Sequence, residues 1–150
     1  MILFTQGGVN NENSVRRNNM NERNMRFGDF IKNKRLKDSR ESTLKDIAGE
    51  LGISLSLLSD IENNRRKPFD ADRIEIFADY FQLSEEDKSL MYDLAARDTG
   101  EIPFDLEDIM MYGEIGEMAR LALRKSNSGV IKEADWKKFI REMEEKEKGE

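Results

Sequence analysis

The sequence predicts an all-α protein in which a helical domain is followed by a helical extension. Three observations support this prediction. From Phe27 onward, apolar residues recur at helical spacings of three and four; proline occurs only twice; and no run alternates between apolar and polar residues as strands do. With 37% hydrophobic residues among 150, the chain has enough apolar material for one modest core.

Composition excludes several functional classes. The chain has no cysteine, which removes disulfides and thiolate metal sites, and no histidine, which removes the commonest general base and metal ligand. No apolar run approaches the length of a membrane span, and the apolar stretch at the start of the sequence is too short for the hydrophobic region of a secretion signal. The carboxylates of Asp105, Glu107 and Asp108 lack calcium-loop spacing and are interpreted as a helix start. We therefore expect a cytoplasmic binding protein without membrane, metal or cofactor, and not an enzyme.

Residues 1–25 are rich in asparagine and predict a disordered tail. Met20 and Met25 are possible internal starts, since organised sequence begins only after them. The arginines Arg16, Arg17 and Arg23 have two interpretations: an arm that touches DNA, or a plain solvated tail.

The first three predicted helices are short and closely spaced. A helix over 26–38 is predicted by the spacing of Phe27, Phe30, Ile31 and Lys34, with Leu36 extending the apolar side. Thr43 caps a second helix that Gly52 ends, and Ser54 caps a third over 54–63. The inward positions are expected to be Leu44, Ile47, Ala48 and Leu51 on the second helix, and Leu58 and Ile61 on the third. A connection of only three residues, Gly52 to Ser54, forces a steep crossing, which is the helix-turn-helix geometry.

The later helices follow capping signals. Pro68 precedes a fourth helix opened by Asp70 or Asp72, and Ser84 caps a fifth. Gly100 and Pro103 then mark a boundary, so domains are predicted at 26–98 and 99–150. The extension is expected to hold helices near 105–111, at 114–126 and from about 132. The fourth and fifth helices are expected to bury Ile74, Phe77, Ala78, Phe81, Leu90, Met91, Leu94 and Ala95.

Charge divides the chain. Residues 1–68 hold 13 basic and 9 acidic residues, a net +4, whereas residues 69–150 hold 12 and 22, a net −10. A basic front half points to a polyanion-binding module followed by an acidic extension. The alternative is that the charge serves solubility alone.

Several segments together resemble the DNA-binding domain of the XRE family, the lambda-repressor-like helix-turn-helix regulators. They are Phe27-Gly28, Arg35-Leu36, Thr43–Ala48, Leu51–Ser54, Leu58–Asn63 and Arg65–Pro68. Over residues 27–96 the resemblance implies a five-helix domain that binds double-stranded DNA. The segment from Ile102 to Ile140 is more weakly similar to the tails of bacterial antitoxin-type XRE regulators.

The resemblance and the helix-turn-helix geometry assign roles to particular residues. The residues expected to face DNA bases are Ser54, Leu55, Ser56, Ser59 and Asp60, and those expected to contact phosphates are Thr43, Lys45, Asn63, Arg65, Arg66 and Lys67. Asp60 either accepts from a cytosine amino group or is an ordinary surface charge. Thr43 and Lys45 lie at a helix start, where free N–H groups favour a phosphate. The family also implies a structural pair between Arg35 and Glu62.

The chain departs from the family pattern in three ways. Asn64 stands where the family usually has glycine, although asparagine tolerates the left-handed conformation. The stretch before Thr43 is about two residues longer than usual, which leaves the register behind Arg35 open. The expected base-facing side has no Arg, Lys, Gln or Asn, so specificity would depend on hydroxyls, Leu55, water and DNA shape. Specific binding is therefore expected to depend more on dimerisation, which doubles the contacts with DNA.

The extension carries more apolar surface than three short helices can bury among themselves. Its apolar residues are Ile109, Met110, Ile115, Met118, Leu121 and Leu123, and the stripe Trp136, Phe139, Ile140 and Met143. They either pack back onto the fourth and fifth helices, form a homodimer, or bind another protein. The predicted function is a dimeric repressor that reads an inverted repeat through the helix at 54–63. The alternative is an antitoxin that neutralises a basic toxin through the extension and regulates its own operon.

Overall fold

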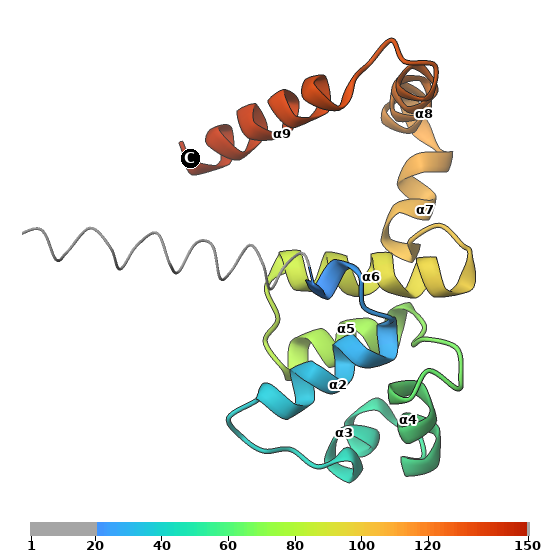
Figure 1. Ribbon diagram of the computed structural model, residues 1–150, viewed down its shortest axis with the longest axis vertical. Coiled ribbons are helices and arrows are strands. Elements are labelled where there is room, and N and C mark those ends of the chain that lie inside the picture. The colour runs from blue at the N-terminus through green and yellow to red at the C-terminus, as the bar shows by residue number, and fades with distance from the viewer. Residues whose placement is uncertain (1–20, 150) are drawn as a thin grey trace, which may run out of the picture. The chain divides into compact units, whose positions relative to one another are not determined.

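The computed structural model describes residues 21–149, and the chain divides into two compact units, 1–105 and 106–150. All regular secondary structure in residues 21–149 is helical, which confirms the all-α prediction. The helices are α2 (Phe27–Lys37), α3 (Leu44–Leu51), α4 (Leu55–Glu62), α5 (Ala71–Tyr80), α6 (Glu85–Thr99), α7 (Phe104–Met111), α8 (Gly113–Asn127) and α9 (Glu133–Lys148) (Figure 1). Each of these helices starts within one residue of its predicted position.

Polar caps explain why these starts are readable from the sequence. The side chains of Thr43, Ser54, Asp70 and Ser84 each accept a hydrogen bond from a backbone N–H in the first turn of the helix that follows, at 3.0–3.1 Å. Gly52 ends α3 in the left-handed conformation, with φ +67°, as its place in the turn predicted. The conformation of the connection between α3 and α4 is therefore set by local residues, namely Gly52 and the Ser54 cap.

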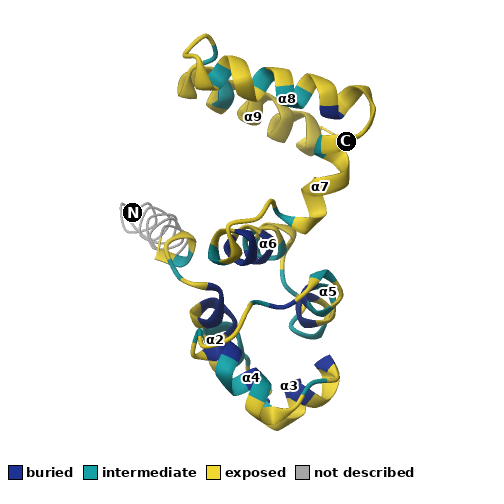
Figure 2. Ribbon diagram, turned by 90° about the vertical axis from the view of Figure 1, so that its right-hand side faces the viewer, coloured by how far each residue is buried: buried dark blue, intermediate teal, exposed yellow. Residues whose placement is uncertain are grey.

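The helices from α2 to α6 close into a ring around one core. α2 packs on α4 and α6, α3 packs on α4 and α5, and α5 packs on α6. Figure 2 shows the buried residues on the inner sides of these helices. The core residues are Phe27, Phe30, Ile31, Ile47, Ala48, Leu51, Leu58, Ile61, Phe69, Ile74, Phe77, Met91, Tyr92, Leu94 and Ala95. Burial of these side chains in one cluster is what holds the short α3 and α4 in place.

Two expectations near the start of this unit are wrong. Leu36 is 62% exposed, because it lies five residues after Ile31 and so about 140° around the helix from the buried face. Residues 21–25 are not a disordered tail: 21–23 are helical, and the Met25 carbonyl accepts from Arg97 Nη2 at 2.9 Å. The rest of the predicted tail, residues 1–20, which includes Arg16, Arg17 and Met20, lies outside the described residues.

The boundary between the units also differs from the prediction. The first unit continues to Asp105, because the chain after α6 stays against it. Phe104 lines a surface hollow together with Phe69 and Ala95. Gly100 ends α6 as expected but does not end the unit.

α5 and α6 are joined by a buried hydroxyl. Tyr92 is 5% exposed, and its Oη donates to Glu75 Oε1 at 2.6 Å. Burial, and then this hydrogen bond, raise the pKa of Tyr92 well above its usual 10. Because the folded state disfavours the ionised tyrosinate, its contribution to stability is fully present below pH 10 and is lost as the pH rises further.

Replacing Tyr92 with phenylalanine should lower the free energy of unfolding by about 1 kcal/mol at neutral pH, because the hydrogen bond to a half-exposed carboxylate is lost. The deficit should shrink as the pH is raised above 10, since phenylalanine has no proton to lose. Urea unfolding of both proteins at pH 7 and at alkaline pH measures this. A deficit that grows with pH would contradict the assignment.

The second unit buries little. Within its described residues, only Gly116 is buried, and the extensive helix-to-helix contacts all lie in the first unit. None of the described helices is long and apolar enough to cross a membrane. The exposed large apolar residues of this unit are Leu106, Ile109, Met111, Tyr112, Ile115, Met118, Leu121, Leu123, Val130, Phe139, Ile140 and Met143.

Candidate nucleic-acid interface

α4 is held from behind by a bidentate ion pair. Arg35 Nε and Nη2 on α2 donate to the two carboxylate oxygens of Glu62 at 2.9 Å each. The two side chains are only 15% and 5% exposed, and the hydrogen bond that Arg35 donates to Glu62 is the main cause that raises the pKa of Arg35. The predicted pair is therefore present. The pair forms although the stretch before α3 is longer than usual; within that stretch, Arg40 Nη2 donates to the Tyr80 carbonyl at 2.6 Å.

A second tie holds the C-terminal end of α4. Asn64 is left-handed, with φ +58°, as expected for this position. Its Oδ1 accepts from the Gly28 N–H at 2.9 Å, and its Nδ2 donates to Asp29 at 3.2 Å. A Cβ on Gly28 would lie 2.3 Å from the Ile61 carbonyl oxygen, so α2 and α4 approach as closely as they do only because residue 28 is glycine. Sequence reasoning predicted the Asn64 turn but missed these contacts, which no local pattern signals.

The outward side of α4 is open. Leu55 is 49% exposed, Ser54 and Ser56 are exposed, and Ser59 is partly exposed. The Ser54 hydroxyl accepts from the Leu57 N–H at 3.1 Å, so one of its two lone pairs is used for capping, while its other lone pair and its proton are not. The structure thus presents three serine hydroxyls and one leucine side chain along the first turns of α4.

Asp60 differs from these four residues. Its carboxylate lies 3.9 Å from Arg66 Nε, with both side chains well exposed. This agrees with the surface-charge interpretation of Asp60. Because Arg66 has this ion-pair partner, it is a weaker candidate for a phosphate contact than its neighbours, although its side chain is 66% exposed.

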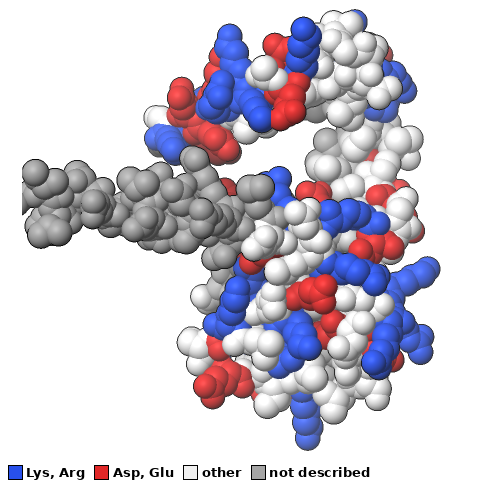
Figure 3. Space-filling view, viewed as in Figure 1, with Lys and Arg blue, Asp and Glu red and all other residues white. Residues whose placement is uncertain are grey.

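The basic segment after α4 supplies cations at one edge of this surface. Arg65 and Lys67 are exposed, and their side chains make no ion pair or hydrogen bond within residues 21–149. Lys45 is exposed on the first turn of α3. The Asn63 side chain instead donates to the Ser59 carbonyl at 2.8 Å and closes the end of α4. Figure 3 shows basic side chains standing out around α3 and beside the segment that follows α4.

The start of α3 is less open to an anion than expected. The Thr43 N–H donates to Asp46 Oδ2 at 2.9 Å, while Thr43 Oγ1 accepts from the Asp46 N–H. This reciprocal capping box places a carboxylate at the helix start, and the backbone N–H of Thr43 is the main cause that lowers the pKa of Asp46. Two of the backbone N–H groups at this helix start, those of Thr43 and Asp46, are therefore already engaged, which leaves fewer donors for the predicted phosphate contact of Thr43 and Lys45. The spacing of three residues between Thr43 and Asp46 is the sequence pattern that could have predicted this capping box.

The main change in net charge along the chain occurs inside the first unit, between its basic first part and its acidic second part, and not between the two units. Residues 26–68 hold ten basic and seven acidic residues, a net +3, whereas residues 69–105 hold three and 11, a net −8. Residues 106–150 hold nine and 11, a net −2. The acidic charge thus belongs mainly to the part of the first unit that holds α5 and α6. The predicted extension, residues 99–150, is acidic but only weakly so, with nine basic and 13 acidic residues, a net −4.

Within residues 21–149, no three carboxylates are placed together as a metal site would require. Comparison of the chain with protein-family models, with curated proteins and with solved structures found no match.

Proposed function

We propose that the chain is a sequence-specific DNA-binding regulator that reads double-stranded DNA through α4. We further propose that α2 to α6 form the five-helix lambda-repressor-like domain of the XRE family. The segments that resemble this family occupy the positions the proposal needs: α3, the Gly52 turn and α4 are consecutive, and the resembling Arg35 and Glu62 are paired. Helix-turn-helix proteins place the second helix of such a pair in the major groove.

One observation carries the proposal. The first turns of α4 are exposed on the outward side while their inward side is fixed by core packing and by the Arg35–Glu62 pair. The exposed groups can form hydrogen bonds with base edges, and Leu55 can contact a thymine methyl group. A fixed and open helix of this kind is what base readout requires.

The surrounding charges favour one direction of approach. Arg65, Lys67 and Lys45 would meet phosphates beside the groove. Residues 69–105, with a net −8, would be repelled by the same phosphates. This division of charge favours an orientation in which the α3–α4 side of the unit faces DNA.

The base-facing side has no side chain that makes a bidentate base contact, so a single copy should discriminate weakly. Two copies on an inverted repeat, with half-sites about 34 Å apart, would double the contacts. A dimer that occupies such an operator would act as a repressor of its own or neighbouring genes.

Salt dependence tests the phosphate contacts. Binding to a random-sequence duplex should weaken steeply as salt is raised, because phosphate neutralisation releases counterions. The double variant Arg65→Ala/Lys67→Ala should lower the slope of log K against log[salt] by about 2 per copy. The charge-matched double variant Lys138→Ala/Lys146→Ala, on α9, should leave the slope unchanged. Equal slopes for the wild type and both variants would contradict the proposal.

The antitoxin alternative gains little from the structure. It depended on an acidic extension, and the second unit carries a net charge of only −2. A basic partner therefore has no strong electrostatic reason to prefer this unit.

A further inference from the structure

α8 presents an apolar stripe that nothing in its own unit covers. Ile115 is 70% exposed and Met118 60% exposed. With Ala122 they follow the spacing of three and four residues that keeps side chains on one face of a helix. Leu121, 52% exposed, borders the stripe. Apolar residues exposed together in this way mark an interaction surface.

Specific contacts fix α8 against its neighbours α7 and α9. A Cβ on Gly116 would lie 2.4 Å from the Ile109 carbonyl oxygen, so α8 approaches the end of α7 very closely. The Arg120 guanidinium donates to the Met110 carbonyl and so caps the last turn of α7. At the other end of α8, Trp136 Nε1 donates to Ser126 Oγ at 2.8 Å. The stripe is therefore held in one orientation although it covers no core, and such preorganisation lowers the cost of binding.

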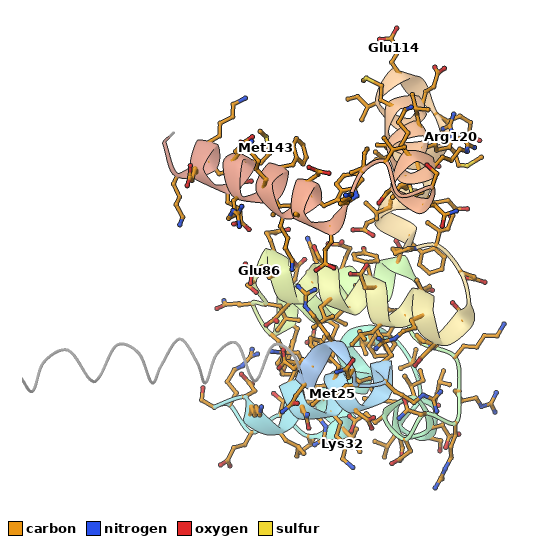
Figure 4. All side chains as sticks on the ribbon, turned by 45° about the horizontal axis from the view of Figure 1, so that its top comes forward. Met25, Lys32, Glu86, Glu114, Arg120 and Met143 are labelled. Carbon is orange, nitrogen blue, oxygen red and sulfur yellow. The ribbon has the colours of Figure 1, made fainter. Side chains whose placement is uncertain are left out.

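The stripe is bordered by an acidic residue at the start of α8 and a basic residue at its end. Glu114 stands in the first turn of α8 and Lys125 in its last, and neither makes an ion pair within the described residues. They are 11 residues apart, close to three full turns, so both border the stripe on the same edge. Leu121 lies between them on that edge. Figure 4 labels Glu114 at one end of α8 and Arg120 farther along it.

From this arrangement we propose that α8 pairs antiparallel with α8 of a second copy of the chain. A twofold axis that passes α8 between residues 119 and 120 places Glu114 of each copy against Lys125 of the other. The same axis places Met118 of each copy against Leu121 of the other. Acidic and basic ends thus meet twice, and the apolar centres cover each other, which is the self-complementarity that a twofold interface requires. A parallel pair would set like charges side by side.

The pairing extends the proposed function by supplying its second copy, and it is tested without DNA. Sedimentation equilibrium at micromolar concentration should give twice the chain mass of 17.5 kDa. Glu114→Lys alone and Lys125→Glu alone should each raise the dissociation constant at least about tenfold, because each creates two like-charge contacts. The double variant Glu114→Lys/Lys125→Glu should return it to within about threefold of the wild type. Lys148→Glu, at the end of α9, is the control and should change nothing.

The double variant separates pairing from helix stability. Both substitutions oppose the dipole of α8, so an effect on the helix alone would make the double variant worse than either single variant. Circular dichroism of each variant measures the helix directly. A monomeric wild type, single variants that dimerise normally, or a double variant as weak as the single variants would each overturn the pairing. A monomer that still binds DNA with a steep salt dependence would overturn the pairing but leave the proposed function standing.

Discussion

Replacing Glu62 with alanine should lower the free energy of unfolding by about 3 kcal/mol. The substitution leaves the Arg35 guanidinium, which is 15% exposed, without its bidentate partner. A charge held away from water without a counterion is costly, and the effect should lie at the low end of the range for buried pairs because Arg35 keeps some contact with solvent. Urea denaturation followed by circular dichroism measures the loss.

Two comparisons isolate the stranded charge as the cause. The double variant Arg35→Met/Glu62→Leu removes both charges and should recover to within about 1 kcal/mol of the wild type. Glu133→Ala breaks an exposed ion pair with Lys137 of even shorter N–O distance, 2.6 Å, and should have no measurable effect. If Glu62→Ala is also without effect, the pair does not hold α4.

Replacing Gly28 with alanine should lower the free energy of unfolding by about 3 kcal/mol, the upper part of the range for overpacking. The added Cβ would lie 2.3 Å and 2.7 Å from the carbonyl oxygens of Ile61 and Glu62. These are backbone atoms, so relief requires that α2 and α4 move apart. That movement would also stretch the hydrogen bond from the Gly28 N–H to Asn64.

Gly49 provides a matched control for this prediction. It lies inside α3, and a Cβ there would meet nothing within 4 Å. Gly49→Ala should therefore stabilise the protein by about 0.5–1 kcal/mol, since alanine has less backbone freedom to lose on folding. Equal effects of the two substitutions in thermal or urea unfolding would show that the close approach at Gly28 is not a constraint.

Local signals explain which parts of the fold could be predicted. Thr43, Ser54, Asp70 and Ser84 each cap a helix through contacts within three residues, so the sequence contains the whole cause. Gly52 likewise forms its turn through its own backbone preference. The Arg35–Glu62 pair spans 27 residues and was predictable only through the family resemblance.

The errors arise where a distant residue decides the outcome. Leu36 is apolar and follows the periodic residues Phe27, Phe30 and Ile31, but its angle around α2 places it outside the buried face. The first unit extends to Asp105, and Phe104 lines one surface hollow together with Phe69, 35 residues earlier, which no local pattern reveals. Gly28 and Asn64 meet across 36 residues, so neither segment alone indicates their hydrogen bond.

The most direct test of the account is a selection of bound duplexes from a random library, by the wild type and by the variant Leu55→Ala/Ser56→Ala. Both positions are exposed, and alanine favours helix, so the fold should be unaffected. We predict that the wild type selects a short inverted repeat. The variant should lose the preference at the positions that these side chains read, with the salt dependence unchanged. A wild type that selects no sequence, or a variant that selects the same sequence with the same preference, would contradict base readout by α4.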